Sequence, residues 1–377
     1  MPLSGIRVVT LEQAVAGPFC SRQLADHGAE VIKIERPDGG DSARAYDNVL
    51  NGTSAYFAWL NRGKQSVVLD LKQDGDRDAC SRLIDSADIV VNNLAPGAME
   101  RLGFGYADVS SRNPRVIWCG ISGYGPDGPM RDKKAYDMLV QAESGVVSVT
   151  GSRDEPAKVG VSIADIASGM YAYASIMTAL YARERTGAGE RIDISMLECL
   201  TEWMTPALYV WQGAGRVVQR AGVRHNMIVP YGAYACADGD VMFAIQTDRE
   251  WRRFCSVVMQ ATALADDARY STNASRVENR QSLEALIEDR FRLHARADII
   301  ALLDAADIAT GAVNDVPSVA SHRQLAARER WTHVESPGGS IPALLPPHNL
   351  QNAPSRMGAV PALGQHTGDV LAAMELT

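Results

Sequence analysis

This 377-residue sequence lacks the features that mark metal-binding, membrane-spanning and exported proteins. Its seven histidines are widely spaced, and its six cysteines form neither a Cys-x-x-Cys pair nor a Cys/His metal spacing, so no metal site is expected. No stretch approaches 18 uncharged apolar residues, and residues 1–5 lack the basic and apolar segments of an export signal. The sequence therefore predicts a cytoplasmic protein with reduced cysteines and no membrane association.

A basic patch is also missing. The chain has 45 acidic against 37 basic residues, a net charge of −8, and no cluster of lysine and arginine along one face. Nucleic acid is therefore not an expected partner, because neutralising phosphates requires such a cluster. Apolar residues at 46% and charged residues at 22% are typical of a globular protein, and the length suits a large domain plus a smaller one.

The N-terminal half alternates short β-rich runs with helical segments. A helix beginning at Gly17-Pro18 and helices over 76–85 and 97–102 lie between the expected strands, which cover residues 6–11, 30–35, 66–71, 88–92 and 115–122. Such alternation predicts an α/β fold with a large, Rossmann-like, doubly wound and mostly parallel sheet.

The pattern changes after residue 200. Residues 231–237 and 240–245, separated by Asp238-Gly239, predict a β-hairpin, and helices are expected over 248–259, 280–293 and 296–305. We therefore expect a large domain from residues 1–200 and 325–377, a small α+β domain over 225–310, and linkers at 201–224 and 311–324. A final helix is expected to start near Asp369.

Residues 123–128 match the G-x-G-x-x-G pattern of dinucleotide-binding proteins. Pro126 and Pro129 prevent this loop from opening a helix, and the match follows the fourth or fifth expected strand rather than the first. The first strand is followed by Ala16-Gly17-Pro18, which is not the fingerprint either. No Ser-His-Asp order, G-x-S-x-G elbow or H-E-x-x-H motif is present. These patterns argue against a nicotinamide-dependent oxidoreductase.

Asp165 stands where a strand-like segment over 159–164 meets an apolar helix predicted over 166–185. No lysine or arginine is close in sequence to pair with it. The carboxylate is therefore either a helix cap or a catalytic group. In both cases the N–H groups and dipole of the helix start are expected to keep it ionised at neutral pH, as a carboxylate nucleophile requires.

Basic residues follow several of the expected strands. In an open α/β sheet the carboxyl ends of the strands share one crevice. Each residue alone is explained by a solvated surface position, whereas together they suit a phosphorylated, adenine-containing ligand. The residues are Lys33, Arg36, Lys72, Arg101 and Lys134.

Ordered motifs along essentially the whole chain give it a resemblance to the class III CoA-transferases, the family of formyl-CoA:oxalate transferase, carnitine CoA-transferase and α-methylacyl-CoA racemase. The motifs are Ala16-Gly17-Pro18, residues 28–37, 61–64, 69–72 and 96–103, Gly123-Tyr124-Gly125, Pro230-Tyr231-Gly232, and Gly364-Gln365-His366-Thr367.

The resemblance implies a role for each matching residue. Asp165 would be the catalytic nucleophile, with Val15, Ala16, Tyr136 and Asp137 as its neighbours. The CoA contacts would be Arg36, Leu69, Lys72, Asn93, Leu94, Arg101 and Lys134. The resemblance further implies an interlocked, ring-like homodimer, with CoA and acyl-CoA as substrates and no tightly bound cofactor.

The family mechanism implies covalent catalysis. Asp165 attacks the donor thioester to form a mixed anhydride, CoA thiolate then forms an aspartyl-CoA thioester, and the acceptor acid reverses these steps. The helix start after Asp165 is expected to donate an N–H to the intermediates.

The racemase branch requires a histidine at the position of Tyr136. A tyrosine hydroxyl has an ordinary pKa of about 10 and is a poor base at neutral pH, so Tyr136 favours a transferase. An acyl-CoA racemase or isomerase and a non-catalytic CoA-binding protein remain alternatives.

The formyl-CoA branch has a glutamine where this chain has Val15, and it has a run of four glycines that is missing here, so oxalate is not the expected acceptor. Residues 11–19 and 59–64 resemble members that move CoA from succinyl-CoA to C4–C5 dicarboxylates such as itaconate, mesaconate or citramalate. A second carboxylate would require a basic partner. Arg44, Arg224 and His225 are candidates, although a surface role is the better explanation for each of them taken alone.

Overall fold

The computed structural model describes residues 1–375 and divides the chain into two compact units. The large unit consists of Met1–Gly145, Val159–Thr205 and Gln324–Thr377, and the small unit of Val146–Lys158 and Pro206–Arg323. These boundaries differ from the expected domains in two ways. Residues 146–158 group with the small unit, and most of the two stretches expected as linkers belong to it as well.

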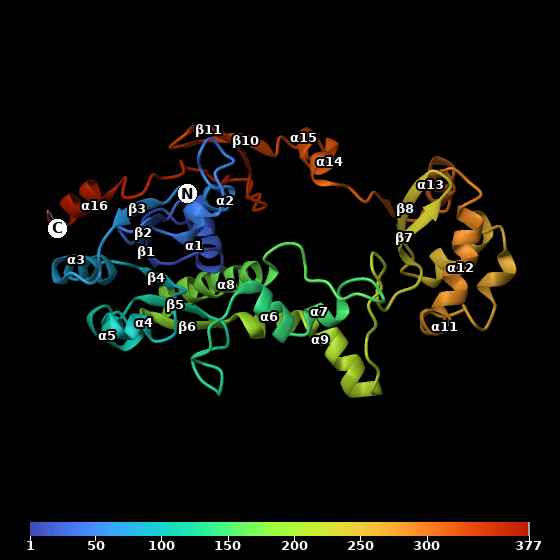
Figure 1. The fold of residues 1–377 in the computed structure, drawn as a ribbon, viewed down its shortest axis with the longest axis horizontal. Helices are drawn as coiled ribbons and strands as arrows, with labels where there is room; N and C mark the ends of the chain where they lie inside the picture. Colours follow the sequence, from blue (N-terminus) through green and yellow to red (C-terminus); the bar gives the residue numbers. More distant parts are fainter. Residues whose placement is uncertain (376–377) are drawn as a thin grey trace. The chain divides into compact units, whose positions relative to one another are not determined.

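A six-stranded parallel sheet forms the centre of the large unit (Figure 1). Its order, β3-β2-β1-β4-β5-β6, places the first and fourth strands side by side, which is the point where ligands bind in sheets of this kind. The sixth strand was not anticipated from the sequence. The strands are β1 Arg7–Leu11, β2 Glu30–Glu35, β3 Gln65–Val68, β4 Ile89–Asn92, β5 Ile117–Ser122 and β6 Glu190–Ser195.

Helices cover both faces of this sheet. Helices α3 (Asp74–Asp85), α4 (Ala98–Arg101), α5 (Tyr106–Arg112) and α16 (Thr367–Glu375) pack on the face that carries Val9, Ile32 and Val90. Helices α1 (Ala16–Asp26) and α8 (Ile163–Thr186) contact the strands and each other on the opposite face. Successive strand residues point to opposite faces, so both faces bury apolar side chains.

The rest of the large unit extends this core. The 3-10 helix η1 spans Ser42–Ala45, and the C-terminal part adds the hairpin of β10 (Trp331–Ser336) and β11 (Gly339–Leu344). The remaining helices are α2 (Ala55–Asn61), α6 (Asp137–Glu143), α15 (Arg323–Ala327) and α9 (Met196–Ala214), of which the last runs into the small unit.

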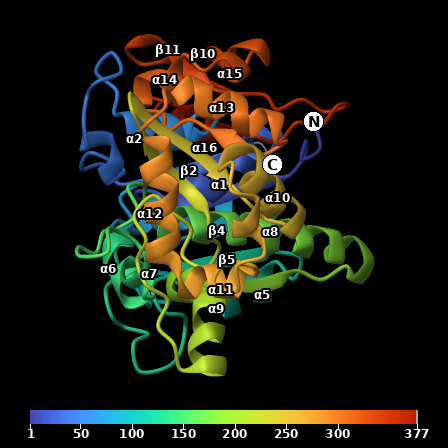
Figure 2. The same ribbon diagram turned by 90° about the vertical axis from the view of Figure 1, so that its right-hand side faces the viewer.

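The small unit has its own aromatic core. Strands β7 (Tyr231–Cys236) and β8 (Gly239–Ala244) form the predicted hairpin, which confirms that expectation. Buried Tyr234, Phe243, Trp251, Phe254 and Phe291 pack around it. The other elements, several of them labelled in Figure 2, are α7 Val146–Val149, α10 Asp248–Arg253, a π-helical turn Phe254–Val258, a 3-10 turn Thr262–Ala265, α11 Asn273–Glu278, α12 Arg280–Phe291, α13 Arg296–Ala305, β9 Thr310–Gly311 and α14 Val316–Ala320.

Two expectations of local structure are wrong. Residues 159–162 form no strand, and α8 begins at Ile163, three residues earlier than expected. Lys33 does not reach the crevice, because its ammonium group is buried beneath the sheet and bound to Glu12 and Asp41.

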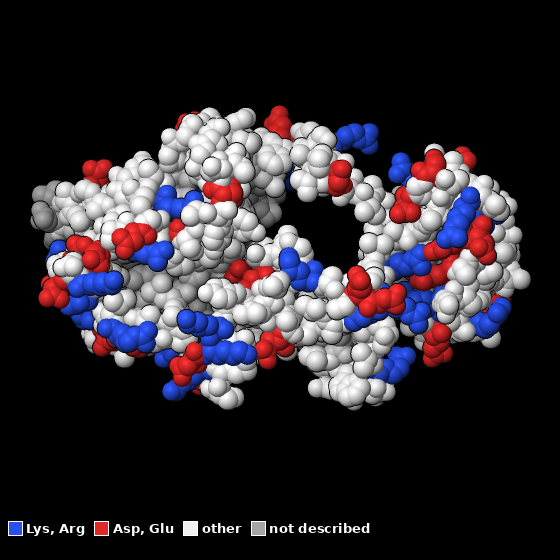
Figure 3. All heavy atoms as spheres, in the orientation of Figure 1, with Lys and Arg blue, Asp and Glu red and all other residues white. Residues whose placement is uncertain are grey.

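Charged side chains of both signs are interspersed on the face drawn in Figure 3. Within residues 1–375, no helix is long and apolar enough to cross a membrane. All six cysteines are buried free thiols. The same part of the chain contains no group of three His, Cys, Asp or Glu side chains arranged to hold a metal ion.

Candidate active site

Asp165 lies in the first turn of α8 but does not cap it. The N-cap position is occupied by Ser162, whose side chain makes no capping bond, and Asp165 is the third residue of the helix. No hydrogen bond or ion pair of the Asp165 carboxylate occurs within residues 1–375. The capping interpretation is therefore wrong, and the carboxylate is left without a structural partner.

The cap of α8 comes instead from Asp137, at the start of α6. Its Oδ1 accepts the backbone N–H of Ala164 at 2.8 Å and that of Asp165 at 3.4 Å. Its Oδ2 accepts the side-chain amide of Gln141 at 2.7 Å. Asp137 thus fixes the backbone that carries Asp165 and places a second carboxylate beside it.

The other N–H groups at this helix start are occupied as well. Ile163 donates to the carbonyl of Val161 at 2.8 Å, and Ile166 donates to that of Ser162 at 2.9 Å. The first turn therefore has no free N–H group, contrary to the expectation that it would donate to a reaction intermediate. Two of these groups bind Asp137 of α6, and the other two bind carbonyl oxygens of the segment that leads into α8.

The surroundings of Asp165 oppose its ionisation. Burial and the neighbouring Asp137 carboxylate raise the pKa of Asp165 to about 7. This result contradicts the expectation that the helix start would keep the group fully ionised, because no cation offsets these two effects. Near neutral pH the protonated and ionised forms are therefore both populated.

Helix α8 packs against the turn that opens α1. At Gly169 a Cβ atom would lie 2.7 Å from the carbonyl oxygen of Ala16 and 3.0 Å from the ring of Phe19. Asp165 and Gly169 are four residues apart and so share one face of the helix. In the structure Asp137 thus lies beside Asp165, and Ala16 contacts α8 one helical turn further along, at Gly169. Tyr136, at the N-cap of α6, is 71% exposed. The roles of these neighbours in the reaction stay predictions.

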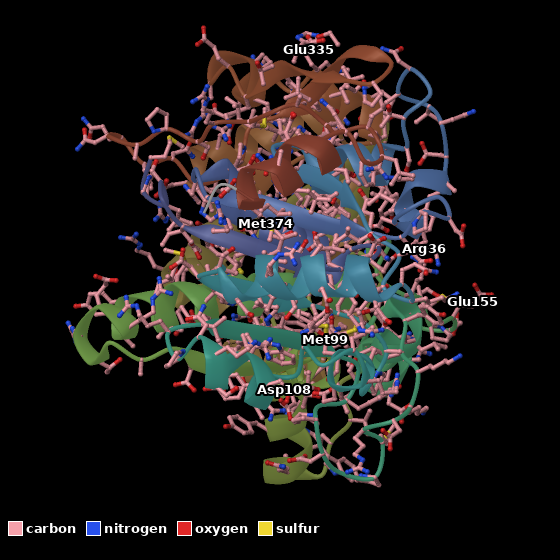
Figure 4. The ribbon with its side chains drawn as sticks, turned by 90° about the vertical axis from the view of Figure 1, so that its left-hand side faces the viewer. Arg36, Met99, Asp108, Glu155, Glu335 and Met374 are labelled. Atoms are coloured by element: carbon pink, nitrogen blue, oxygen red, sulfur yellow. The ribbon has the colours of Figure 1, made fainter. Side chains whose placement is uncertain are left out.

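The expected CoA contacts follow the carboxyl ends of the strands. Arg36 follows β2, Leu69 follows β3, and Asn93 and Leu94 follow β4, all at one edge of the parallel sheet. Figure 4 labels Arg36, which is exposed, and Met99 of α4, which is buried. The remaining candidates are exposed and lie in later loops or helices: Lys72, Arg101 and Lys134.

Asn93 has a structural task at this edge. Its side chain accepts the N–H of Gln13 at 2.8 Å and donates to the carbonyl of Gln13 at 2.9 Å. These two bonds join the loops after β1 and β4 where the strand order reverses. No pattern in the sequence pointed to this clamp, whereas the spacing of Asp137 and Gln141 by four residues was a usable signal for their bond.

The three candidate partners of a substrate carboxylate have partners within the chain. Arg44 binds Glu35 at 2.7 Å and 2.8 Å and donates to the carbonyl of Pro361. Arg224 pairs with Glu284 and Glu288 in the small unit, where it lines a cavity of about 930 Å³. His225 stacks on the ring of Tyr231, and burial lowers its pKa. Their roles as substrate ligands stay predictions.

The model of CoA-transferase family III matches residues 3–367 of this chain. The protein is a member of CoA-transferase family III. This membership confirms the resemblance inferred from the sequence and the assignment of the protein as an enzyme of this class.

Characterised relatives of this family III CoA-transferase align over nearly its full length. It is 34% identical to succinate–glutarate CoA-transferase of Agrobacterium fabrum, over 99% of this chain and 96% of the relative. It is 32% identical to succinyl-CoA:mesaconate CoA-transferase of Haloarcula hispanica, over 98% and 95%. A CAIB/BAIF family protein from Brucella suis has a crystal structure that superposes with a TM-score of 0.84 at 33% identity, covering 99% of both chains.

Proposed function

We propose that this family III CoA-transferase moves CoA from succinyl-CoA to a C4–C5 dicarboxylic acid, with Asp165 as the nucleophile. The observation that carries the proposal is the Asp165 carboxylate itself. It is buried in part, lacks any partner in residues 1–375, and lies beside a second carboxylate. A buried acid without a structural partner destabilises the fold, and such groups are concentrated at functional sites.

The proposed reaction begins with attack by an Asp165 oxygen on the thioester carbonyl of the donor. The C–S bond breaks, leaving a mixed anhydride on Asp165 and free CoA thiolate. The thiolate then attacks the carbonyl carbon of Asp165, so that the donor acid leaves and an aspartyl-CoA thioester remains. The acceptor carboxylate attacks that thioester and the same steps run in reverse. An acyl derivative of a carboxylate stays activated, which suits a reversible transfer.

A pKa near 7 for Asp165 supports this role. The ionised form needed for attack is available at neutral pH, and a carboxylate of higher pKa is the stronger nucleophile. Asp137 contributes to both properties, since its charge raises the pKa and its oxygen fixes the backbone N–H of Asp165.

The proposed CoA site is the sheet edge formed by the carboxyl ends of β2, β3 and β4. Arg36, Lys72 and Arg101 are exposed near this edge and can pair with phosphate groups, while Leu69 and Leu94 offer apolar contacts. Arg44 would bind a second carboxylate of the acceptor only by leaving Glu35.

The choice of donor and acceptor rests on the relatives. Proteins named for succinate with glutarate, and for succinyl-CoA with mesaconate and D-citramalate, align over 93–96% of their own length, at 31–34% identity. An acetyl-CoA:oxalate CoA-transferase of Acetobacter aceti is 36% identical, over 90% of this chain. Oxalate therefore belongs in the test as a competing acceptor, although Val15 and the absent glycine run speak against it.

We also propose that the protein acts as a homodimer, interlocked as the resemblance implies. Large apolar side chains of α8 and α9 are exposed in the single chain, among them Tyr181 at 63% and Trp203 at 48%. Exposed apolar residues of this size are commonly covered in an interface. Light scattering on the purified protein should give twice the mass of the chain, whereas the mass of one chain would exclude the dimer.

The test of the activity is a transfer assay with defined acids. The purified protein is incubated with succinyl-CoA and, separately, with glutarate, itaconate, mesaconate, citramalate, oxalate and carnitine, and acyl-CoA products are identified by mass spectrometry. Transfer to one or more C4–C5 dicarboxylates is expected. Transfer to oxalate or carnitine alone would refute the proposed acceptor class, and no transfer to any acid would refute the activity as stated.

The covalent step has its own test. The protein is mixed with succinyl-CoA without acceptor, quenched in acid and digested, and the peptide containing Asp165 is searched for a CoA adduct. The adduct is expected in the wild type and not in Asp165→Asn. An adduct on a different residue would remove Asp165 from the mechanism.

A further inference from the structure

A cluster of four buried charges lies directly beneath the turn that precedes α1. The side chains of Glu12, Lys33 and Lys64 have no exposed surface, and Asp41 is equally buried. Lys64 Nζ lies 2.7 Å from Glu12 Oε1, and Lys33 Nζ lies 2.8 Å from Asp41 Oδ2 and 3.4 Å from Glu12 Oε1. We call these four residues the buried charge cluster. The reaction proposed above uses none of them.

Three members of the buried charge cluster bind the backbone of the turn. Lys33 Nζ donates to the carbonyl of Glu12 at 3.2 Å. Asp41 Oδ1 accepts the N–H of Ala14 at 2.9 Å. Lys64 Nζ donates to the carbonyl of Pro18 at 3.2 Å. The turn from residue 12 to residue 18 is therefore held at its beginning, its middle and its end.

The conformation of this turn requires such restraint. Ala14 has a φ of +60°, in the left-handed region that a residue with a Cβ rarely adopts. Gly17 approaches Glu12 so closely that a Cβ atom would lie 2.9 Å from that side chain. Asn93 adds its clamp on Gln13 from the loop after β4. A strained backbone conformation persists only where several surrounding contacts hold it in place.

The other side of the turn faces the helix that carries Asp165. The carbonyl oxygen of Ala16 lies against Gly169, one helical turn after Asp165 and on the same face. The turn is thus enclosed between the buried charge cluster and α8. A shift of the turn would change the space next to the Asp165 carboxylate.

We propose that the buried charge cluster is a positioning device that holds the Val15–Ala16 turn at a fixed distance from Asp165 during CoA transfer. This inference rests on the proposed function, because it assigns Asp165 to the chemistry. Glu12, Lys33, Asp41 and Lys64 are positioning residues. They act through the backbone of the turn and do not touch the substrate.

Charged groups suit this task better than apolar ones. A buried ion pair adds little net stability compared with apolar residues of the same volume, but its hydrogen bonds are directional. Ammonium groups donate to particular carbonyl oxygens, and a carboxylate accepts a particular N–H, so the turn has one permitted position. A misplacement of about 1 Å near reacting groups can lower a rate about 100-fold.

The chain offers a matched control in the same unit. Asp26, at the other end of α1, pairs with Arg22 at 3.1 Å and with Arg62 at 2.9 Å, and all three side chains are at most 5% exposed. This group is as buried as the charge cluster but makes no hydrogen bond to the turn of residues 12–18. Asp26→Asn and Asp41→Asn therefore remove comparable buried charges, and only the second alters a side chain that is bonded to the turn and to Lys33.

Both variants are compared with wild type in steady-state transfer and in thermal unfolding. Both are expected to unfold at a lower temperature. Asp41→Asn should lower kcat about 10- to 100-fold with KM for both substrates within about threefold of wild type, whereas Asp26→Asn should keep kcat within about twofold. Equal losses of kcat in the two variants, or an unchanged kcat in Asp41→Asn, would overturn the proposal.

Ala14→Gly provides a second variant that should fold normally. Glycine adopts a φ of +60° without strain, so the native structure is tolerated while the turn becomes more mobile. We expect an unfolding temperature within a few degrees of wild type and a kcat lowered about threefold or more. If Asp41→Asn does not fold, Ala14→Gly alone tests the proposal. A kcat of Ala14→Gly equal to that of the wild type then overturns it.

The outcome is separable from that of the proposed function. A wild-type protein that transfers CoA to none of the tested acids refutes the function. A wild type that transfers CoA, with variants of the turn that match its kcat, refutes only the positioning role.

Discussion

Two groups of buried carboxylates in the large unit have opposite electrostatic environments. Around Glu12, burial raises the pKa, but the ammonium groups of Lys64 and Lys33 outweigh it and leave the pKa below its usual value. Around Asp165, burial and the carboxylate of Asp137 act in the same direction and raise the pKa to about 7. Burial is common to both sites, and the charge of the neighbours differs.

This difference separates a structural acid, Glu12, from the proposed nucleophile, Asp165. Glu12 is ionised, fully paired and fixed, so it contributes hydrogen bonds and no chemistry. The Asp165 carboxylate has no hydrogen-bond or ion-pair partner in the part of the chain that the structure describes, and its pKa of about 7 leaves both protonation states populated at neutral pH. A carboxylate that is buried without a cation is a candidate reactive group, while one with two lysines is a structural one.

The strongest way to break this comparison is Asp165→Asn. The amide has nearly the same shape but cannot form the anhydride, so kcat should fall by at least about a thousandfold. Steady-state transfer rates measure the loss, and calorimetric CoA binding close to wild type serves as the control. A variant with more than about a tenth of wild-type turnover would return Asp165 to a structural role.

Asp137→Asn tests the electrostatic half of the comparison. Without the second charge the pKa of Asp165 should fall, so the rise of kcat/KM with pH should move about one unit below its wild-type position near pH 7. The pH profile of kcat/KM for the donor measures the shift. A rise at the same pH in both proteins would mean that burial alone sets the pKa.

Gly169→Ala tests the packing that joins the two sites. The new Cβ would lie 2.7 Å from the carbonyl oxygen of Ala16, so the turn before α1 must move. We therefore expect the free energy of unfolding to fall by about 1–3 kcal/mol and kcat to fall as well. Gly75→Ala in α3 is the matched control, because among residues 1–375 nothing beyond its chain neighbours and the adjacent helix backbone lies within 4 Å of its Cβ position. Chemical denaturation that shows equal stability for both variants would contradict the close contact.

The smallest expected effect is on stability. The unfolded chain releases the Asp165 proton near pH 4 and the folded chain near pH 7, so the wild type loses stability between these values and the penalty is complete above pH 7. Asp165→Asn removes this pH-dependent loss of stability, because an amide does not ionise. The unfolding temperature of the variant should exceed that of wild type by about 2–4 °C at pH 8 and match it near pH 4. The same difference in unfolding temperature at both pH values would contradict this prediction.

Local patterns predicted much of the fold, whereas the candidate site residues came from the family resemblance. The alternation of strands and helices predicted the parallel sheet up to β5, and the turn at Asp238-Gly239 predicted the hairpin of the small unit. Strand β6 was missed because its sequence, Glu190–Ser195, alternates charged and apolar residues at the edge of the sheet rather than forming an apolar run. Periodicity alone did not distinguish the segment before Ile163 from a strand.

The partners of charged residues could not be predicted in the same way. The sequence around Lys33 does not distinguish it from an exposed lysine in a strand. In the folded chain, however, its side chain is buried and paired with Asp41 and Glu12. Asp165 has no neighbouring cation in sequence, and only the family resemblance, not any local pattern, indicated that Asp137 would lie beside it. Contacts between distant segments decide ionisation, and they exist only once the chain has folded.

The outer edge of the sheet depends on the last residues of the chain. The N–H of Ser66 is bound by the ring of His366 and that of Val68 by the hydroxyl of Thr367, so side chains from the C-terminal segment occupy the free edge of β3. Figure 1 shows α16 beside this strand. During synthesis, this edge is completed about 300 residues after it is made. Until then the nascent chain presents an open strand that other chains can pair with, and a ribosome-bound fragment should need shielding from aggregation.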